Sequence, residues 1–279
     1  RLVDVAHGLG VVPAAMSVRC SLWPMCDSLK KASQVLGCPS CLAKKKGKPL
    51  FDFARKQGVK KVILEKGSPF CTYMPHVKPE GMAGLLREKG MDVSIVEYTG
   101  SLEPTVREMA RLLGREDRTA TLLETYRSEN KKTMDTLAGK TFAPKVVIIN
   151  GVFQESTGKT FLRIEAPGGY VDRYLLAPLG SKNTGAGMVP KDKTPSKGHF
   201  SVRKLTGLIK AAPEAIVITG DGLAVQKAIE MALKKNPALA RVPAIERHAI
   251  YSLPGFVSSS LVGYPLILRR WAKALEKGE

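Results

Sequence analysis

Five cysteines stand in the first 71 residues: Cys20, Cys26, Cys38, Cys41 and Cys71. Two thiols three positions apart, as in the segment CPSC at 38–41, can reach each other or one metal ion. This pair therefore suits a structural disulfide, a metal or cluster site, or two inert thiols. Cys20 and Cys26 suit a second disulfide, or they complete a four-thiolate set with that pair. Since five is an odd number, at least one thiol cannot be in an intramolecular disulfide.

A second group of potential ligand atoms lies just after these residues in the segment CTYMPH. It brings a thiol, a phenol, a thioether and an imidazole within six residues, at Cys71, Tyr73, Met74 and His76. Sulfur and imidazole donors suit a transition metal, or the open coordination face of a metal chelate. Local packing around Pro75 is the other interpretation of this composition, and the residue types alone leave both open.

The periodicity of the chain predicts the elements that would position these residues. Short β-branched runs alternate with amphipathic stretches, which is the pattern of α/β units with largely parallel strands. The predicted strands are 61–65, 92–98, 145–150, 215–219 and 249–253. The predicted helices are 79–89, 116–137, 224–235 and 257–276. The helix over 116–137 contains neither Gly nor Pro and would span about 30 Å, so it can serve as a rigid strut between two α/β halves.

The composition excludes several classes of protein. The 279 residues are 44% hydrophobic and 25% charged, as in ordinary globular domains, and no apolar run approaches the roughly 20 residues of a membrane helix. The formal net charge of +19 should attract anionic partners. The basic runs lack interleaved aromatic residues, so we expect no nucleic-acid partner. Because the chain has no nucleophile elbow, no HExxH motif and no paired carboxylates on one predicted element, we do not expect an enzyme.

The second half of the chain carries five segments whose order and spacing form a pattern. They are LLGREDRTATLLETY (112–126), APKVVIIN (143–150), GGYVDRYLLAPLGSKNTGAG (168–187), FSVRKLTGLIKAAPEAIVIT (200–219) and NPALARVPAIERHAIYSLPG (236–255). In layout this series resembles the helical-backbone (class III) substrate-binding proteins of ABC importers, which carry siderophores, haem, cobalamin and similar metal complexes. The first half resembles that family less closely, through residues 4–24 and 48–67.

The resemblance implies a fold, a domain organisation and a function. The fold class would be α/β, with two α/β lobes of mainly parallel sheets joined by one long backbone helix. The N-terminal lobe would cover 1–115, the connecting helix 116–138 and the C-terminal lobe 139–279. The protein would capture a metal-containing or anionic ligand, such as an iron complex, haem, cobalamin or an oxyanion, in the cleft between the lobes.

The candidate ligand-binding residues are those that this layout places in loops at the carboxyl ends of strands, or beside the opening segment of the first lobe. They are Cys20, Trp23, Cys71, Tyr73, Met74, His76, Phe153, Tyr170, Asp221 and Phe256. In the family each lobe also docks on the permease through an acidic residue. Asp52 falls at the first such position, whereas the second falls on Arg203, which reverses the charge of the family pattern.

The resemblance further implies an ABC permease and a small-molecule or metal-chelate ligand as partners. It implies a periplasmic or extracellular location, with membrane association only through an anchor or through the permease. The given chain opens with no leader pattern, so we expect any export signal to have been removed or never to have existed.

A cytoplasmic metallocofactor protein is the alternative from a different class. In that case Cys20, Cys26, Cys38, Cys41 and Cys71 would hold an iron–sulfur cluster or a corrinoid between two α/β lobes. The sequence does not identify the bound group, and a metal complex and an iron–sulfur cluster are the two candidates.

Overall fold

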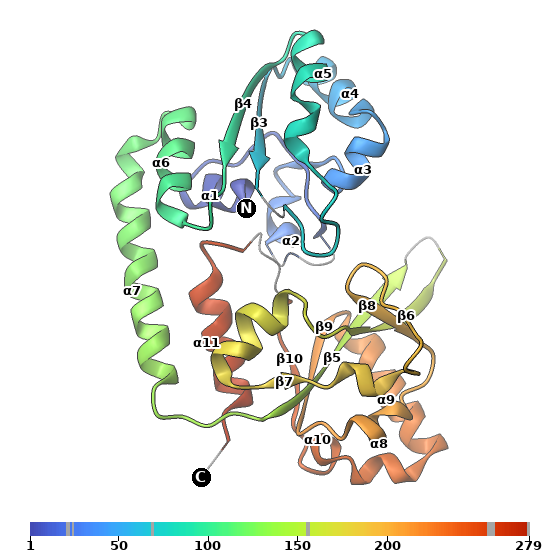
Figure 1. The fold of residues 1–279 in the computed structure, drawn as a ribbon. Coiled ribbons are helices and arrows are strands. Elements are labelled where there is room, and N and C mark those ends of the chain that lie inside the picture. Colours follow the sequence, from blue (N-terminus) through green and yellow to red (C-terminus); the bar gives the residue numbers. More distant parts are fainter. Residues whose placement is uncertain (21–22, 24, 68–69, 155–156, 256–259, 278–279) are drawn as a thin grey trace. The chain divides into compact units, whose positions relative to one another are not determined.

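The computed structural model describes residues 1–20, 23, 25–67, 70–154, 157–255 and 260–277. The chain divides into two compact α/β units (Figure 1). Unit 1 comprises Arg1–Lys131 and Val257–Pro265, and unit 2 comprises Lys132–Phe256 and Leu266–Glu279. The boundary at 131/132 lies inside the long helix α7 (Thr119–Leu137), so this helix joins the two units. None of the helices described is both long and apolar enough to cross a lipid bilayer.

Unit 1 is built on two small parallel sheets. β3 (Lys61–Lys66) pairs with β4 (Asp92–Glu97) along the full length of both strands. β1 (Ala15–Met16) pairs with β2 (Gln34–Val35). The strands predicted at 61–65 and 92–98 are therefore confirmed to within one residue at each end. The helices of this unit, besides the first part of α7, are α1 (Leu2–Gly8), α2 (Cys26–Leu29), α3 (Pro39–Lys44), α4 (Lys48–Gln57), α5 (Ala83–Glu88) and α6 (Leu102–Leu113).

α6 shows how the sequence specifies a helix of unit 1. Its buried residues, Thr105, Val106, Met109 and Ala110, repeat at the three-to-four-residue interval of one helix face. Val106, Met109 and Ala110 pack with residues of α1, β4 and α7 in one hydrophobic core. The helix ends at Gly114, which adopts the left-handed conformation (φ 62°) that a residue with a Cβ avoids.

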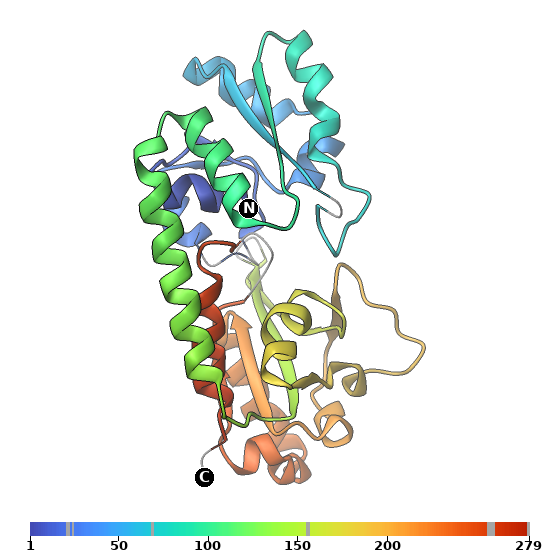
Figure 2. The same cartoon turned by 60° about the vertical axis from the view of Figure 1, so that its left-hand side comes forward.

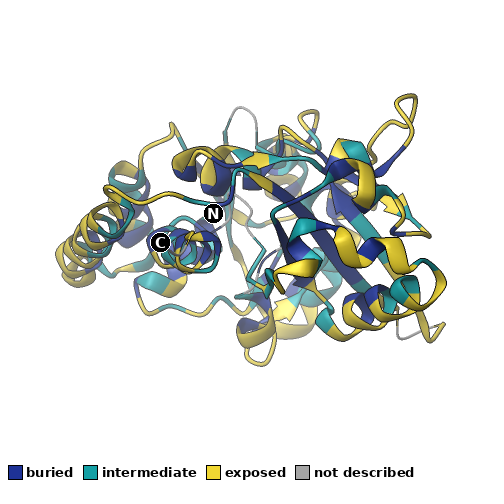
Figure 3. Cartoon of the chain, turned by 90° about the horizontal axis from the view of Figure 1, so that it is seen from below, coloured by how far each residue is buried: buried dark blue, intermediate teal, exposed yellow. Residues whose placement is uncertain are grey.

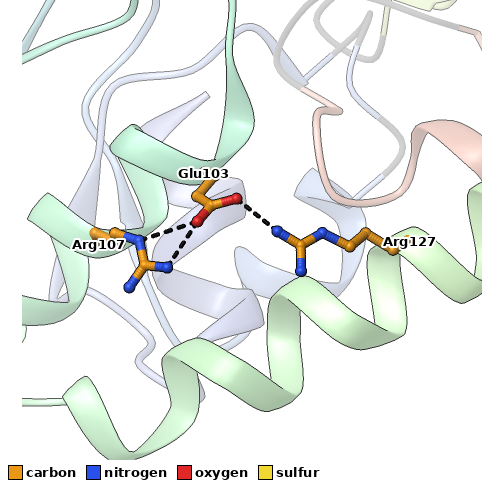
Figure 4. Close-up of polar contacts among 3 residues, drawn as sticks. All are labelled: Glu103, Arg107 and Arg127. Atoms are coloured by element: carbon orange, nitrogen blue, oxygen red, sulfur yellow. Dashed lines mark hydrogen bonds and ion pairs between the residues drawn. The ribbon is translucent and has the colours of Figure 1, made fainter.

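An ion triad joins α6 to α7 inside unit 1 (Figure 4). Glu103 Oε1 accepts hydrogen bonds from Arg107 Nε (3.1 Å) and Nη2 (2.6 Å), and Glu103 Oε2 accepts one from Arg127 Nη2 (2.6 Å). The hydrogen bonds from Arg107 lower the pKa of Glu103. Because these side chains are exposed, the triad orients α7 more than it stabilises the fold.

Unit 2 is built on one six-stranded mixed sheet (Figures 1 and 2). The strand order is β10-β9-β5-β6-β8, and β7 pairs with the start of β5. β5 pairs in parallel with β9 and β7, and β9 pairs in parallel with β10, whereas β6 is antiparallel to both of its neighbours. The strands are β5 (Lys145–Gln154), β6 (Lys159–Glu165), β7 (Lys182–Asn183), β8 (His199–Val202), β9 (Ala215–Gly220) and β10 (Ile250–Ser252).

Burial explains why β5 and β9 are continuous apolar runs. Residues 146–151 of β5 and 215–219 of β9 are all buried, as expected of strands covered on both faces. In Figure 3 the buried, dark blue parts of the chain include strands, while the helices show an exposed yellow face. The helices of unit 2 are α8 (Gly207–Ala211), α9 (Gly222–Lys235), α10 (Pro243–Glu246) and most of α11 (Tyr264–Leu275).

The C-terminal part of α7 lies beside α11 within unit 2 (Figures 1 and 2). Thr133 is fully buried there, and its Oγ1 accepts a hydrogen bond from Arg269 Nη1 (3.4 Å). α7 is thus held to unit 2 by this packing, and to unit 1 by the buried Leu122 and Leu123 together with the Glu103 triad.

Two predicted elements differ from the structure. β5 continues past the predicted end at residue 150 and turns back into the antiparallel β6, because Gly151 to Gln154 and residues 159–162 pair as a hairpin. The predicted helix 257–276 begins only at Tyr264, where Pro265 in the first turn favours a helix start. The part of that prediction over 257–259 lies outside the described residues.

Candidate functional site

The candidate site of unit 1 is the loop that follows β3. Arg1 fastens its beginning: Nε donates to Glu65 Oε1 (2.5 Å), and Nη2 donates to the Phe70 carbonyl (3.3 Å). The guanidinium also stacks over the rings of Tyr98 (4.4 Å to the centroid) and Phe70 (5.6 Å). Both members of the Arg1–Glu65 ion pair are only 6% exposed. A buried ion pair with two cation–π contacts therefore holds the loop to the ends of β3 and β4.

The segment beyond this anchor carries the predicted ligand atoms. Two tight turns shape it, because Met74 N donates to the Cys71 carbonyl (3.2 Å) and Val77 N donates to the Met74 carbonyl (3.1 Å). Val77 is buried and holds the end of the segment, while Cys71, Tyr73 and Met74 are partly exposed and His76 is exposed. The structure thus brings these four side chains together on one short, anchored loop.

Trp23 does not lie on that loop or on a surface. Its side chain is 1% exposed and packs with Met16, Cys26 and Leu29 in a separate small core. Cys20 and Cys26 are joined in a disulfide. The prediction that Trp23 faces a ligand is therefore corrected, because its ring fills a hydrophobic core.

The five cysteines do not form a common ligand set in the described part of the chain. Cys20 and Cys26 bond to each other, and Cys38 Sγ donates a hydrogen bond to Cys41 Sγ at 3.0 Å without a disulfide. Cys71 is a thiol outside any disulfide. Among the described residues no three or more His, Cys, Asp or Glu side chains are grouped as a metal site requires. The four-thiolate alternative is corrected for this reason.

In unit 2, the carboxyl ends of β5 and β9 position the remaining predicted residues. Asn150 Nδ2 donates to Thr219 Oγ1 (3.1 Å), which cross-links the two strands below their ends. Beyond this bond the backbones approach so closely that a Cβ on Gly151 would lie 2.1 Å from the Asp221 carbonyl oxygen. Asp221 then begins α9, and its Oδ1 accepts a hydrogen bond from Ala224 N (3.0 Å). Asp221 is thus a helix cap as well as a residue at the strand end.

The predicted aromatic residues of unit 2 differ in exposure. Phe153, near the end of β5, is 51% exposed and available to a ligand or partner. Tyr170 is 4% exposed and stacks on Tyr174 (centroids 6.4 Å apart), whose ring is 40% exposed. Tyr174, which no pattern in the sequence marks, is therefore the more accessible residue of this pair. Phe256 lies outside the described residues.

A partly buried carboxylate lies next to these tyrosines. Asp172 accepts a hydrogen bond from Gly168 N, and burial raises the pKa of its carboxyl above the ordinary value. It stands in a short π-helical turn, Asp172–Leu176, a conformation that is often found at functional sites. Sequence periodicity gives no signal for such a turn, so Asp172 could not be selected in advance.

The two predicted docking residues both lie on the surface of their own units. Asp52 of α4 bonds Lys48 (2.6 Å) and Arg55 (3.0 Å), and the hydrogen bond from Lys48 lowers its pKa. Arg203 directly follows β8 and is exposed, with Lys204 beside it. The second predicted docking position therefore presents a basic side chain at the surface, in place of the acidic one that the resemblance implies.

Comparison with known proteins identifies the fold. No protein-family model matches the sequence, and no curated protein matches it. Among solved structures, the apo periplasmic heme-binding protein RhuT from Roseiflexus sp. RS-1 is similar over 98% of this chain and 94% of its own, with a TM-score of 0.61 and 16% identity. A periplasmic heme-binding protein from Pseudomonas aeruginosa covers 98% and 89%, with a TM-score of 0.58 and 19% identity.

The iron-uptake system-binding protein FeuA from Bacillus subtilis is similar as well. It matches over 97% of this chain and 89% of its own, with a TM-score of 0.54 and 14% identity. At such identities the likeness establishes the fold. The predicted fold class, two α/β lobes joined by one long helix, is confirmed.

Proposed function

We propose that this chain, which shares its two-lobed α/β fold with solved periplasmic binding proteins, is a solute-binding protein of an ABC importer. It captures a metal-containing or anionic ligand, such as an iron complex, haem, cobalamin or an oxyanion, and delivers it to a permease. The observation that carries this proposal is the likeness over 97–98% of the chain to proteins described as heme-binding or as parts of iron uptake. Because fold alone does not imply function, the residues of the site must support it as well.

The loop after β3 supplies that support. Cys71, Tyr73 and Met74 are partly exposed, and His76 is exposed, on a segment that Arg1 anchors to the sheet. Thiol, phenolate, thioether and imidazole groups are suitable ligands for the metal of a chelate. An anchored loop presents them with little loss of conformational entropy on binding, which favours affinity. The net charge of +19 favours chelates that carry carboxylates or other anionic groups.

An extracytoplasmic location is part of the proposal. The Cys20–Cys26 disulfide supports it, because disulfides persist mainly in oxidising compartments.

The permease would contact the surfaces that carry Asp52 and Arg203, so a partner adapted to this chain needs an acidic residue opposite Arg203. We assign no catalytic role to any residue. The metallocofactor alternative is disfavoured, because two of its five thiolates are consumed in a disulfide.

Titration with defined chelates tests the proposal. Purified full-length protein is titrated with hemin, cyanocobalamin and a ferric catecholate chelate, and absorbance is recorded together with the fluorescence of Trp23 and Trp271. We expect saturable binding of at least one of these probes with a stoichiometry near one ligand per chain. His76→Ala should weaken binding of a probe with an open metal coordination position about tenfold or more, because one donor or contact is lost.

The matched control is His7→Ala, which removes an exposed histidine from α1. It should bind the same probe with unchanged affinity. If none of the three probes gives a signal above that of the probe in buffer without protein, a metal chelate of these classes is not the ligand. Unchanged affinity of His76→Ala would show that His76 does not contact the probe, and an equal loss in both variants would show that the loss is not specific to the loop after β3.

A further inference from the structure

The two cysteine pairs of unit 1 lie in different surroundings. Cys20 and Cys26 are bonded, and Cys26 is fully buried in a core with Met16, Trp23 and Leu29. A sulfur that solvent does not reach is protected from an attacking thiolate. This disulfide therefore has the surroundings of a structural bond.

The second pair lies at the surface. Cys41 is exposed and Cys38 is half-buried, and Cys38 Sγ donates a hydrogen bond to Cys41 Sγ at 3.0 Å. The start of α3 brings the two sulfurs close together. Cys38 is the extended residue before α3 (φ −75°, ψ 155°), and Pro39, the first residue of the helix, favours a helix start at this position. The side chains of Cys38 and Cys41 then lie over the same first turn. Neither the fold nor the candidate ligand loop requires two thiols at this place.

The two thiols are not equivalent. Burial, followed by the hydrogen bond to Cys41, raises the pKa of Cys38 above its usual value. Cys38 Sγ donates the hydrogen bond, while the sulfur of Cys41 accepts it and is open to solvent. Cys41 is the sulfur that an incoming disulfide meets first.

We propose that Cys38 and Cys41 form an exchangeable dithiol–disulfide site, separate from the structural Cys20–Cys26 bond and independent of the transport ligand. The oxidant is a disulfide, R–S–S–R′, of a small molecule or a thiol–disulfide carrier protein. The Cys41 thiolate attacks one sulfur of it, which forms a Cys41–S–S–R bond and releases R′–S⁻. Cys38 then loses its proton and attacks the Cys41 sulfur, which forms the Cys38–Cys41 bond and releases R–S⁻. In total the protein loses two electrons and two protons, and the disulfide becomes two thiols.

The charge around the site selects the reaction partner. Lys44, Lys45 and Lys46 follow Cys41 at the end of α3 and are all exposed. Positive charge raises the local concentration of anionic reactants, so disulfides that carry carboxylates should react faster than neutral ones. Glutathione disulfide and the aromatic disulfide DTNB are of the favoured kind.

Thiol counting with DTNB tests the mechanism. Full-length protein carrying Cys71→Ser, which removes the remaining thiol, is mildly reduced and mixed with DTNB. We expect the release of two thionitrobenzoate ions per chain and none retained on the protein. With Cys38→Ser added, one ion should be released and one retained, because no second thiol resolves the mixed disulfide. With Cys41→Ser added instead, the reaction should be about tenfold slower.

Retention of the label on the intact pair would overturn the proposal, since it would show that Cys38 does not attack Cys41. Equal rates for the two single-thiol variants would overturn the assignment of Cys41 as the attacking sulfur. Replacing the three lysines by glutamine should slow the reaction with DTNB and leave the reaction with neutral hydroxyethyl disulfide unchanged.

Selective reduction tests whether the bond is exchangeable. The oxidised protein is equilibrated with glutathione buffers of increasing reducing strength, alkylated and digested, and the peptides are weighed. The Cys38–Cys41 bond should open under conditions in which Cys20–Cys26 stays closed. If both pairs open together, or if neither opens until the chain unfolds, the Cys38–Cys41 bond is structural and the proposal fails. Chelate binding is measured in the same samples, so a failure here is distinguishable from a failure of the transport function.

Discussion

Single buried charges in unit 1 are each held by specific neighbours. Arg1 and Glu65 neutralise each other between two aromatic rings, so neither leaves an uncompensated charge. Asp4 of α1 is held differently: Val262 N donates to its Oδ2 at 2.7 Å, and the positive charges of the N-terminus and His7 offset only part of the cost of burying it. Because Asp4 is only 5% exposed, burial raises its pKa above the usual 3.8. The ionised form of this carboxyl therefore weakens the fold at neutral pH.

Asp4→Asn should raise the urea midpoint of unfolding at pH 7. The folded chain keeps the Asp4 proton at pH values where the unfolded chain has lost it, so the contribution of Asp4 to stability is complete below pH 3.8 and decreases as the pH rises through its raised pKa. The gain from the substitution should accordingly be smaller at pH 4 than at pH 7. Asp27→Asn, on an exposed ion pair, is the control and should show little change. A lower midpoint for Asp4→Asn at pH 7 would mean that the charged hydrogen bond to Val262 outweighs desolvation.

At the scale of elements, the turn between β9 and α9 places the unit 2 candidate residues. Gly220 adopts a positive φ (72°), and a Cβ there would lie 2.4 Å from the Gly151 carbonyl oxygen. Two glycines on neighbouring parallel strands thus let the backbones approach and aim Asp221 at the first turn of α9. The segment Gly220–Asp221–Gly222 is predictable as a turn from sequence, because glycine and aspartate favour turns and helix caps.

Gly151→Ala should destabilise the protein by roughly 3 kcal/mol, since the new Cβ would overlap the Asp221 carbonyl and force the strands apart. It should also weaken chelate binding if the ends of β5 and β9 contact the ligand. Gly84→Ala is the matched control: it lies in α5 with open space around the position and should be neutral or slightly stabilising. Chemical denaturation measures both, and an unchanged midpoint for Gly151→Ala would show that the close approach of the backbones is not required.

For the whole molecule, periodicity predicts the architecture better than the site. The five apolar strands and the long helix follow from β-branched runs and from a segment without Gly or Pro, and all are present. β6 could not be predicted, because lysine, threonine and arginine interrupt its apolar residues. β8 could not be predicted because its four residues, HFSV, are too few to show a periodicity. Trp23 could not be assigned to the core from sequence, since its packing against Met16 and Leu29 depends on chain segments that come together only in the fold.

The candidate loop after β3 is predictable for a similar physical reason. Its ligand atoms are contiguous in sequence, so no long-range contact is needed to group Cys71 with His76. The residues of unit 2 come from separate strands, and their exposure depends on packing that the sequence does not encode locally. Tyr174, exposed beside the buried Tyr170, is the clearest example.

The central claim is that the chain carries a ligand for import, and native mass spectrometry tests it most directly. Protein is isolated anaerobically from its own source, and its intact mass is compared before and after denaturation, together with metal analysis. The proposal predicts a dissociable adduct whose mass and metal content match a chelate such as haem, a corrinoid or a ferric siderophore, or match an oxyanion. Iron and sulfide retained on cysteine thiolates, with no dissociable ligand, would contradict it and favour the metallocofactor alternative.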